Sequence, residues 1–590
     1  MMALLCLKSL FLFILIACFC TDLSAQADQW TWMKGDNSPF ISGVYGTKGV
    51  AATTNKPGSR RLSISWTDKA GNFWLFGGNG YDLQGNLGYL NDLWKYDVST
   101  NNWTWIKGDS IADRPGVYGT AGVSSPANKP GGRRRSVAWT DTSGNLWLFG
   151  GNGYASTVSS SGYLSDLWKY NIATNEWTWV KGDNTADNSG VYGTKNTPSA
   201  ANKPGARYGA VSWADTQGFL WLFGGLATVS ESQAELNDLW KYNISTNMWT
   251  WVSGSNAANA SGTYGTKGVS SASNTPGARE YAVTWTNGSD NLFLFGGSGL
   301  AVAGEDGYLN DLWRFNTTTN HWTWIKGNNV ANADASYGSK GVSSETNTPG
   351  AREYSCKWAD AMGNLWLFGG DGYATGSAGY LNDLWKYDNT TNQWTWIKGN
   401  NSVNLTGVYG TKGVSSSTNN PGAREYGVSW TDHAGNFWLF GGDAYYAIDQ
   451  SDYLNDLWKY TTQAPCIPNT WTGAISTDWN NPANWSCNTL PAQGANVVIP
   501  STTNKPLINT AITVGNLNLN GEFNLNGQSL TITGAVTGTG TITGSPTSDI
   551  VVTGNAGVLN FTAGAAVLHS LTVNPGASAT INTTVTIVGH

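Results

Sequence analysis

Six arginines, each the last residue of a Pro-Gly-x-Arg sequence, are the clearest candidates for binding chemistry in this chain. They are Arg60, Arg133, Arg207, Arg279, Arg352 and Arg424. A guanidinium offers forked donors, so a ring of six would suit a carboxylate or another anion. Six aspartates recur in step with them, at Asp92, Asp166, Asp238, Asp311, Asp383 and Asp456. The alternative is that each arginine forms an ion pair with one aspartate. Six arginines matched by six aspartates favour this alternative, because buried charges are usually paired.

A second set of candidates lies where the repeats differ in length. Five tyrosines occur in or beside these variable stretches: Tyr81, Tyr154, Tyr373, Tyr445 and Tyr446. The last stretch adds Asp443, Asp449 and Asp452. Function often resides in loops that a rigid scaffold holds, so these residues are predicted to contact a glycan or protein ligand. Single exposed aromatic residues are also common without any function.

The elements that position these residues come from one unit written six times. The step from the Asp-Leu-Trp tryptophan to the next Trp-Thr-Trp is always 9 residues, as from Trp94 to Trp103. From the second tryptophan of that motif to the arginine is always 28 residues, and from the arginine to a Gly-Gly pair always 17. Only the step from the second glycine to the next Asp-Leu-Trp tryptophan varies, between 15 and 17 residues. All variation in length is therefore confined to one loop in each unit.

Each unit contains four strand-like runs separated by turn residues. In the second full unit they are Arg133–Thr140, Leu146–Gly150, Leu164–Tyr170 and Trp177–Lys181. Four antiparallel strands at a regular repeat are typical of a propeller blade. The chain opens on a lone Trp-Thr-Trp strand at Trp30, which we expect to complete the sixth blade and close the ring. The variable loop and the constant 28-residue step should then share one face, where we expect the ligand.

The Gly-Gly pair, a following tyrosine, six residues and then tryptophan form a pattern that resembles the kelch repeat. Tyr96 and Trp103 meet it, and Tyr460 is completed across the closure by Trp30. The resemblance covers residues 28–461. It implies a six-bladed β-propeller whose blades are similar to the galactose oxidase central domain, although that ring has seven. The units here are longer than the kelch norm, mainly in the constant 28-residue step.

The same resemblance raises an enzymatic alternative, either galactose-oxidase-like or sialic-acid-epimerase-like. A galactose-oxidase copper site would need two histidines. Within the repeats the only histidines are His321 and His433, and they fall in different parts of their units. Near-identical blades favour a symmetric binding platform, because catalysis needs groups in different environments. We therefore expect no catalytic residue, metal or cofactor, and we interpret the repeated tryptophans as core between blades.

The N-terminus is typical of an exported protein. Residues 1–27 combine Lys8, an apolar run and the small-x-small sequence Ala25-Gln26-Ala27, which predicts a signal peptide. A lipoprotein-type anchor at Cys18 is the alternative. No stretch is long enough for a transmembrane helix.

The net charge of −6, without a basic run, argues against a nucleic-acid partner. The expected location is extracellular or at the cell surface.

After residue 461 the repeat stops and a different pattern begins. Residues 462–495 form a Trp-rich segment in which Cys466 and Cys487 are predicted to form a disulfide. Cys356 aligns with Val428 of the next unit and is interpreted as a core residue. Residues 496–590 alternate short apolar strands with Gly, Ser, Thr and Asn, which predicts a β-helix or other β-rich domain, expected to be incomplete. The predicted fold class is thus all-β.

Overall fold

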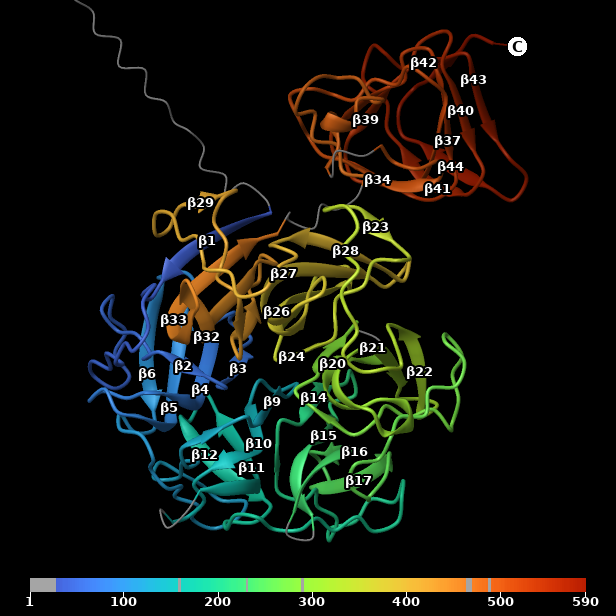
Figure 1. The fold of residues 1–590 in the computed structure, drawn as a ribbon. Coiled ribbons are helices and arrows are strands. Elements are labelled where there is room, and N and C mark those ends of the chain that lie inside the picture. The colour runs from blue at the N-terminus through green and yellow to red at the C-terminus, as the bar shows by residue number, and fades with distance from the viewer. Residues whose placement is uncertain are drawn as a thin grey trace, which may run out of the picture. The chain divides into compact units, whose positions relative to one another are not determined.

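The computed structural model describes residues 28–157, 161–229, 232–287, 291–462, 469–486 and 490–589. In these residues the fold is all-β, and the only helices are two 3₁₀ turns, η1 (Val302–Gly304) and η2 (Pro482–Asn484). Contacts divide the chain after Thr462 into a ring of six sheets and a smaller β unit (Figure 1). The predicted signal peptide, Cys18, Cys466 and Cys487 fall outside the described residues.

Blade 2 illustrates how each repeat folds. Two short strands next to the central channel, β8 (Arg133–Arg134) and β9 (Val137–Thr140), pair antiparallel with β10 (Leu146–Gly153). Farther out follow β11 (Gly162–Asn171) and β12 (Glu176–Lys181). Acidic and amide side chains shape the turns: Asp141 accepts a hydrogen bond from the amide of Asn145 at 2.9 Å, in the manner of an Asx turn.

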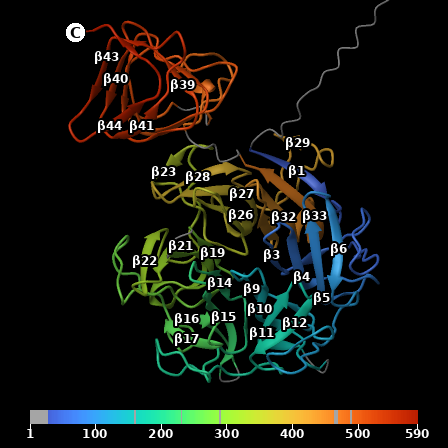
Figure 2. The ribbon, with the colours of Figure 1, turned by 180° about the vertical axis from the view of Figure 1, so that it is seen from behind.

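The other five blades have the same order from the channel outward (Figure 2). Blade 1 contains β2 (Arg60–Arg61), β3 (Ile64–Thr67), β4 (Phe73–Tyr81), β5 (Leu87–Asp97) and β6 (Asn102–Lys107). Blade 3 contains β13 (Arg207–Tyr208), β14 (Val211–Ala214), β15 (Leu220–Val229), β16 (Ser232–Asn243) and β17 (Met248–Ser253). Blade 4 contains β18 (Arg279–Glu280), β19 (Val283–Thr286), β20 (Asn291–Leu300), β21 (Asp306–Asn316) and β22 (His321–Lys326). Blade 5 contains β24 (Arg352–Glu353), β25 (Cys356–Ala359), β26 (Leu365–Tyr373), β27 (Ala378–Asp388) and β28 (Gln393–Lys398). Blade 6 contains β30 (Arg424–Glu425), β31 (Val428–Thr431), β32 (Phe437–Ala447), β33 (Gln450–Thr461) and β1 (Gln29–Lys34).

The N-terminal strand β1 closes the ring, as its lone Trp-Thr-Trp motif predicts. Trp30 lies opposite Tyr460 of β33, and Trp32 lies opposite Trp458. Trp30 is fully buried and contacts Trp358 and Phe368 of blade 5. The first strand of the ring is therefore packed into its last blade, which leaves no free edge there.

The innermost strand of every blade is broken, where the sequence predicts one continuous run. Two residues after each arginine the backbone enters the left-handed region, with φ between 57° and 68°. We call these six positions the kink residues: Leu62, Arg135, Gly209, Tyr281, Tyr354 and Tyr426. Their amides join neighbouring blades: Arg135 donates to the carbonyl of Leu62 at 3.0 Å, and Tyr281 to that of Gly209 at 2.9 Å. Such conformations are unfavourable for non-glycine residues, so the surrounding ring must hold them in place.

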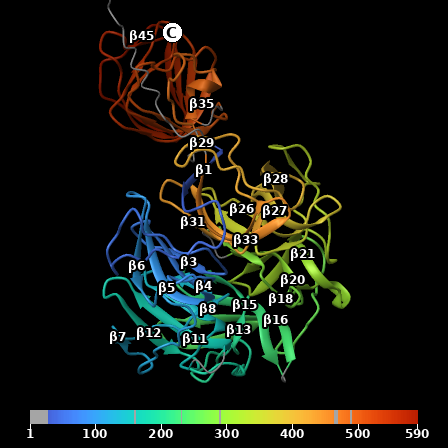
Figure 3. The same cartoon turned by 60° about the vertical axis from the view of Figure 1, so that its left-hand side comes forward.

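The constant 28-residue step covers the outer edge of the blade that follows it. In three blades it supplies a short extra strand: β7 (Ser124–Ser125) pairs with β12 and β29 (Ser415–Ser416) with β1 (Figure 3), and β23 (Ser343–Ser344) pairs with β28 (Figure 1). In blade 2, Asn128 also donates to the carbonyl of Trp177 in β12 at 3.2 Å. The sequence predicts this step to lie on the ligand face; the part of it that pairs here instead protects an edge strand from pairing with other chains.

Aromatic side chains form the core between blades, which confirms the interpretation of the repeated tryptophans. The six Asp-Leu-Trp tryptophans are fully buried: Trp94, Trp168, Trp240, Trp313, Trp385 and Trp458. Trp66 of blade 1 donates through Nε1 to the carbonyl of Trp147 in blade 2 at 3.0 Å, and the other innermost strands repeat this bond. Cys356 is buried in the same layer, and burial raises the pKa of its thiol to about 12. Cys356 is thus a core residue, as predicted.

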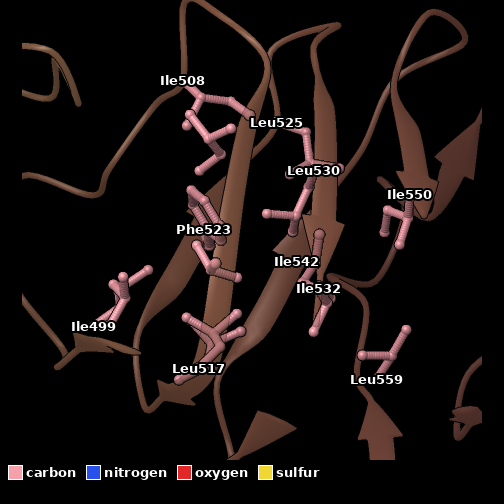
Figure 4. Close-up of a cluster of buried hydrophobic side chains, with 14 of the residues drawn as sticks. Ile499, Ile508, Leu517, Phe523, Leu525, Leu530, Ile532, Ile542, Ile550 and Leu559 are labelled. Carbon is pink, nitrogen blue, oxygen red and sulfur yellow. The ribbon is translucent and has the colours of Figure 1, made fainter. Parts of the chain in front are cut away.

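The C-terminal unit is a β-solenoid of short parallel strands. They are β34 (Ala495–Ile499), β35 (Ile512–Leu519), β36 (Glu522–Asn524), β37 (Ser529–Ile532), β38 (Val536–Thr537), β39 (Thr541–Thr543), β40 (Asp549–Val552), β41 (Asn555–Leu559), β42 (Val567–Leu568), β43 (Ser570–Val573), β44 (Ser578–Ile581) and β45 (Thr586–Ile587). Equivalent apolar residues stack from coil to coil: Leu530 pairs in register with Ile550 (Figure 4), and on its other side with Ile512. Trp479 stacks on Phe523 with 5.2 Å between ring centroids, which places the Trp-rich segment in the same core.

Candidate ligand-binding mouth

The six arginines predicted as an anion site are buried in ion pairs beneath the surface. Arg352 binds Asp383 through both Nη atoms, at 2.7 and 2.8 Å, and donates to the carbonyls of Gly350 and Gly369 at 3.0 and 3.1 Å. The other five arginines repeat these bonds with Asp92, Asp166, Asp238, Asp311 and Asp456. The arginine side chains are at most 1% exposed. The structure therefore contains the pairing described above as the alternative, and the guanidinium groups have no surface left for a ligand.

Each of these ion pairs also explains why the 28-residue step has a constant length. The 28-residue segment before blade 1 contains Tyr45, whose hydroxyl donates to Asp92 at 2.7 Å. Trp94 donates through Nε1 to the same carboxylate oxygen at 2.7 Å. An inserted or deleted residue would leave the buried carboxylate without one of its donors. The equivalent tyrosines are Tyr118, Tyr192, Tyr264, Tyr337 and Tyr409.

The kink residues place one arginine and three tyrosines on the axis of the ring. The guanidinium carbon of Arg135 lies 4.8 Å from the ring centroid of Tyr281, and 5.8 Å from those of Tyr354 and Tyr426. The rings of Tyr281 and Tyr354 are 4.0 Å apart between centroids, and those of Tyr354 and Tyr426 are 3.9 Å apart. One side chain of blade 2 thus contacts rings from blades 4, 5 and 6, which is possible only near the axis.

The residues just before the kinks form what we call the mouth, on the face that carries the variable loops. They are Arg61, Arg134, Tyr208, Glu280, Glu353 and Glu425, together with Asp371 and Asp443, which pair in register with Glu353 and Glu425. Blades 1 and 2 contribute cations and blades 4, 5 and 6 contribute carboxylates. The predicted symmetric platform is therefore wrong: the scaffold is sixfold, but the mouth has a basic side and an acidic side.

Burial makes the carboxylates of the acidic side hard to ionise. Burial, and then the neighbouring Glu280 and Glu425, raise the pKa of Glu353 to about 9. Burial likewise raises the pKa of Glu425 to about 8 and that of Glu280 to about 7. Asp443, which pairs with Arg61 at 3.0 Å, also has a raised pKa because it is buried. Carboxyl groups of this kind can accept hydrogen bonds, donate a proton near neutral pH or bind a cation.

Four of the five predicted tyrosines stand around this mouth. Each packs against a tyrosine from the neighbouring blade, and we call the pairs the rim. They are Tyr81 with Tyr453, Tyr154 with Tyr89, Tyr373 with Tyr308 and Tyr445 with Tyr380, at centroid distances of 6.4, 6.0, 6.2 and 5.5 Å. Tyr446 is not part of the rim; its hydroxyl donates to Gln450 at 2.9 Å. Asp449 lies in the adjoining turn with a φ of 56°.

Below the kink residues the innermost strands line an open cavity of about 750 Å³. Its lining is mostly hydroxyl, small and tryptophan side chains. Lys357 is the only Lys, Arg, Asp, Glu or His among the described residues that line it. The ammonium of Lys357 donates to Thr284 at 2.5 Å, and burial lowers the pKa of Lys357 to about 8.

Sequence reasoning missed the mouth because it looked for what the repeats share. Arg61, Arg134 and Arg135 were not singled out, and the three glutamates were not recognised as a cluster. The sequence does contain a signal for the mouth. The two residues that follow each repeated arginine change from blade to blade, whereas the residues around them stay constant. The two histidines lie apart: His321 begins β22 and His433 occupies the turn between β31 and β32.

Comparisons with known proteins agree with this architecture. Residues 191–339 match the family model described as KLHDC2/KLHL20/DRC7 Kelch-repeats domain. The fold is a six-bladed β-propeller, and with this match the propeller is of kelch-repeat type. Residues 470–563 match a model described as Domain of unknown function (DUF8693).

Among solved structures, the one titled "Structure of YjhT" is similar at 14% sequence identity, with a TM-score of 0.40. The alignment covers 70% of this chain and 95% of that one. Among the residues that the structure describes, none belongs to a helix with the length and hydropathy to span a bilayer.

Proposed function

We propose that the propeller is a secreted or cell-surface binding module that recognises a glycan through the mouth. The observation that carries this proposal is the rim of four tyrosine pairs around an uneven set of carboxylates and guanidinium groups. Tyrosine combines an apolar ring face with a polar edge, which suits the apolar face of a sugar. The carboxylates and guanidinium groups can accept from and donate to its hydroxyl groups.

A glycan array probed with the purified propeller tests this proposal. Tyr373→Ala combined with Tyr445→Ala removes two rim rings, each worth about 1 kcal/mol, and should weaken glycan binding by at least about tenfold. Tyr446→Ala is the matched control, since this half-buried tyrosine lies outside the rim, and it should bind as the parent does. If no glycan binds, or if the double variant binds normally, the glycan proposal fails. A protein ligand would then be the remaining form of a binding function.

Export is part of the same proposal and is supported only by residues 1–27. Expression of the complete chain in a bacterial host, followed by fractionation, distinguishes the possibilities. A mature protein outside the cytoplasm that begins at Asp28 supports cleavage of a signal peptide. A lipid-modified Cys18 supports the anchored alternative, and a full-length cytoplasmic protein contradicts both.

A carbohydrate-active enzyme is the second candidate, and the raised pKa values of Glu353 and Glu425 favour it. Groups of this kind can act as general acids near neutral pH. Mass spectrometry of glycans after incubation with the protein would reveal a change of mass or linkage. Stoichiometric copper together with oxidase activity would support the galactose-oxidase-like form of this candidate. Unchanged glycans would leave binding as the function.

A further inference from the structure

Three carboxylates from two neighbouring blades converge on the acidic side of the mouth. Glu353 in β24, Asp371 in β26 and Glu425 in β30 each contribute one oxygen, and these three oxygens lie within 4.8 Å of one another. Glu353 and Asp371 pair in register, so both come from blade 5, whereas Glu425 comes from blade 6. Within the described parts of the chain, none of the three forms an ion pair.

Two of these carboxylates are held in place by tyrosines from the preceding blade. Tyr308 of blade 4 donates to Asp371 Oδ2 at 2.8 Å. Tyr380 of blade 5 donates to Glu425 Oε1 at 2.7 Å. Each bond fixes the orientation of its carboxylate, and Asp371 also accepts a hydrogen bond from the backbone amide of Gly372. Outer hydrogen bonds of this kind orient the ligands of metal ions in proteins.

The third carboxylate, Glu353, is buried and has no partner. Glu353 is 9% exposed. Across the ranges that the structure describes, its carboxylate receives no hydrogen bond. A buried carboxyl group without a hydrogen-bond partner is unusual, so Glu353 is the group whose polar atoms a bound cation would satisfy most directly.

The charges around the cluster do not supply that cation. Arg135 lies close enough to attract Glu353 electrostatically, but Glu280 and Glu425 repel it. Arg61 is already paired with Asp443 at 3.0 Å. No ion pair of the described residues therefore neutralises the cluster, and a bound cation would favour the ionised form of its carboxyl groups.

We propose that Glu353, Asp371 and Glu425 bind a hard divalent cation, which is calcium rather than a transition metal. The set is all oxygen, whereas zinc and copper sites usually include histidine or cysteine. Its three oxygens lie within 4.8 Å of one another, which is about twice a calcium–oxygen distance of roughly 2.4 Å. The sequence predicts no metal site, and this inference does not depend on the glycan proposal.

Calorimetric titration of calcium into the chelator-treated mature chain tests the site. The parent should show one saturable site. Glu353→Gln keeps the size of the side chain and removes its charge, and it should weaken calcium binding by about 100-fold or more. Tyr380→Phe removes an orienting hydrogen bond and should weaken it by about tenfold. Glu235→Gln is the control, because Glu235 is a half-buried carboxylate of blade 3 outside the cluster, and its affinity for calcium should match the parent.

Two results would overturn the proposal: no saturable calcium binding up to about 10 mM, or parent-like affinity in Glu353→Gln. Circular dichroism checks the folding of each variant. If Glu353→Gln does not fold, the same calcium titration is carried out on Asp371→Asn, whose substitution disturbs folding less because Asp371 is only half-buried. Parent-like calcium affinity in Asp371→Asn would then overturn the proposal. Calcium binding is measured without glycan, and glycan binding is measured with chelator present. Failure of either proposal is thus distinguishable from failure of the other.

Discussion

Arg135 of blade 2 donates a hydrogen bond through Nη1 to the hydroxyl of Tyr281 of blade 4, close to the axis of the ring. Both are kink residues, with φ values of 60° and 59°. The guanidinium also lies 5.0 Å from the ring of Tyr208 in blade 3. The axis of this sixfold scaffold is therefore occupied by one asymmetric contact, which joins blades that are not neighbours in the sequence.

Replacement of Arg135 by alanine should lower the free energy of unfolding by about 2–3 kcal/mol. The substitution removes a charged hydrogen bond and the attraction between the guanidinium and the surrounding tyrosine rings. Urea denaturation followed by tryptophan fluorescence measures the change. Arg114→Ala, at an exposed arginine, should change the stability by less than about 0.5 kcal/mol. Equal stability of the two variants would show that the axial contact contributes nothing.

The fold could be predicted because its signals are periodic. Constant steps of 9, 28 and 17 residues fix the length of each strand and loop, and a lone Trp30 motif at the start implies closure. The broken innermost strand could not be predicted, because Leu62, Tyr281 and Tyr354 are ordinary strand residues with no preference for positive φ. Their conformation comes from the hydrogen bonds between blades, which no single repeat reveals.

Substitution of one partner in a buried ion pair should be strongly destabilising. Arg352→Ala should cost about 3–5 kcal/mol, because it leaves Asp383 charged and unpaired in the interior. Arg207→Ala should do the same through Asp238. Thermal denaturation followed by circular dichroism measures both. If either variant instead folds normally and selectively loses a bound anion, the arginines serve a ligand and the structural role is wrong.

The site was harder to predict than the fold because repetition hides it. The repeated arginines attract attention, yet all of them are buried. The residues that differ between blades, such as Arg134 and Glu353, stand at the same step of the repeat and gather at the mouth only when the ring closes. The rim tyrosines were found because the variable loop could be identified from its length. Pairing of Tyr373 with Tyr308 required the order of the blades in space.

Replacement of Trp30 by alanine should open the closure between β1 and β33. Trp30 is fully buried, and loss of a buried tryptophan costs about 3–5 kcal/mol. Because β1 belongs to the first part of the chain and β33 to the last part of the ring, blade 6 should become sensitive to protease before the others. Limited proteolysis with mass spectrometry locates the first cuts. Cuts that begin in blade 3 would contradict this prediction.

Lys357 should make the stability of the propeller depend on alkaline pH. Burial lowers the pKa of Lys357 from 10.5 to about 8 in the folded protein. The charged form is therefore penalised by folding. The penalty is complete below about pH 8 and disappears as pH rises to 10.5, where the unfolded chain also loses the proton. Among the described residues that line the cavity, Cys356 is the one other ionisable group; its pKa is about 12, so it stays neutral over this range.

Lys357→Met should consequently be more stable than the parent at pH 7, by about 1–2 kcal/mol. The difference between the two proteins should shrink between pH 8 and 10.5, since the parent gains stability there while the variant does not. Urea denaturation at pH 7, 9 and 10.5 measures both proteins. Lys69→Met, at an exposed turn lysine, is the control and should follow the parent at every pH. A variant that is less stable than the parent at pH 7 would mean that the charged ammonium stabilises the channel, contrary to the argument from burial.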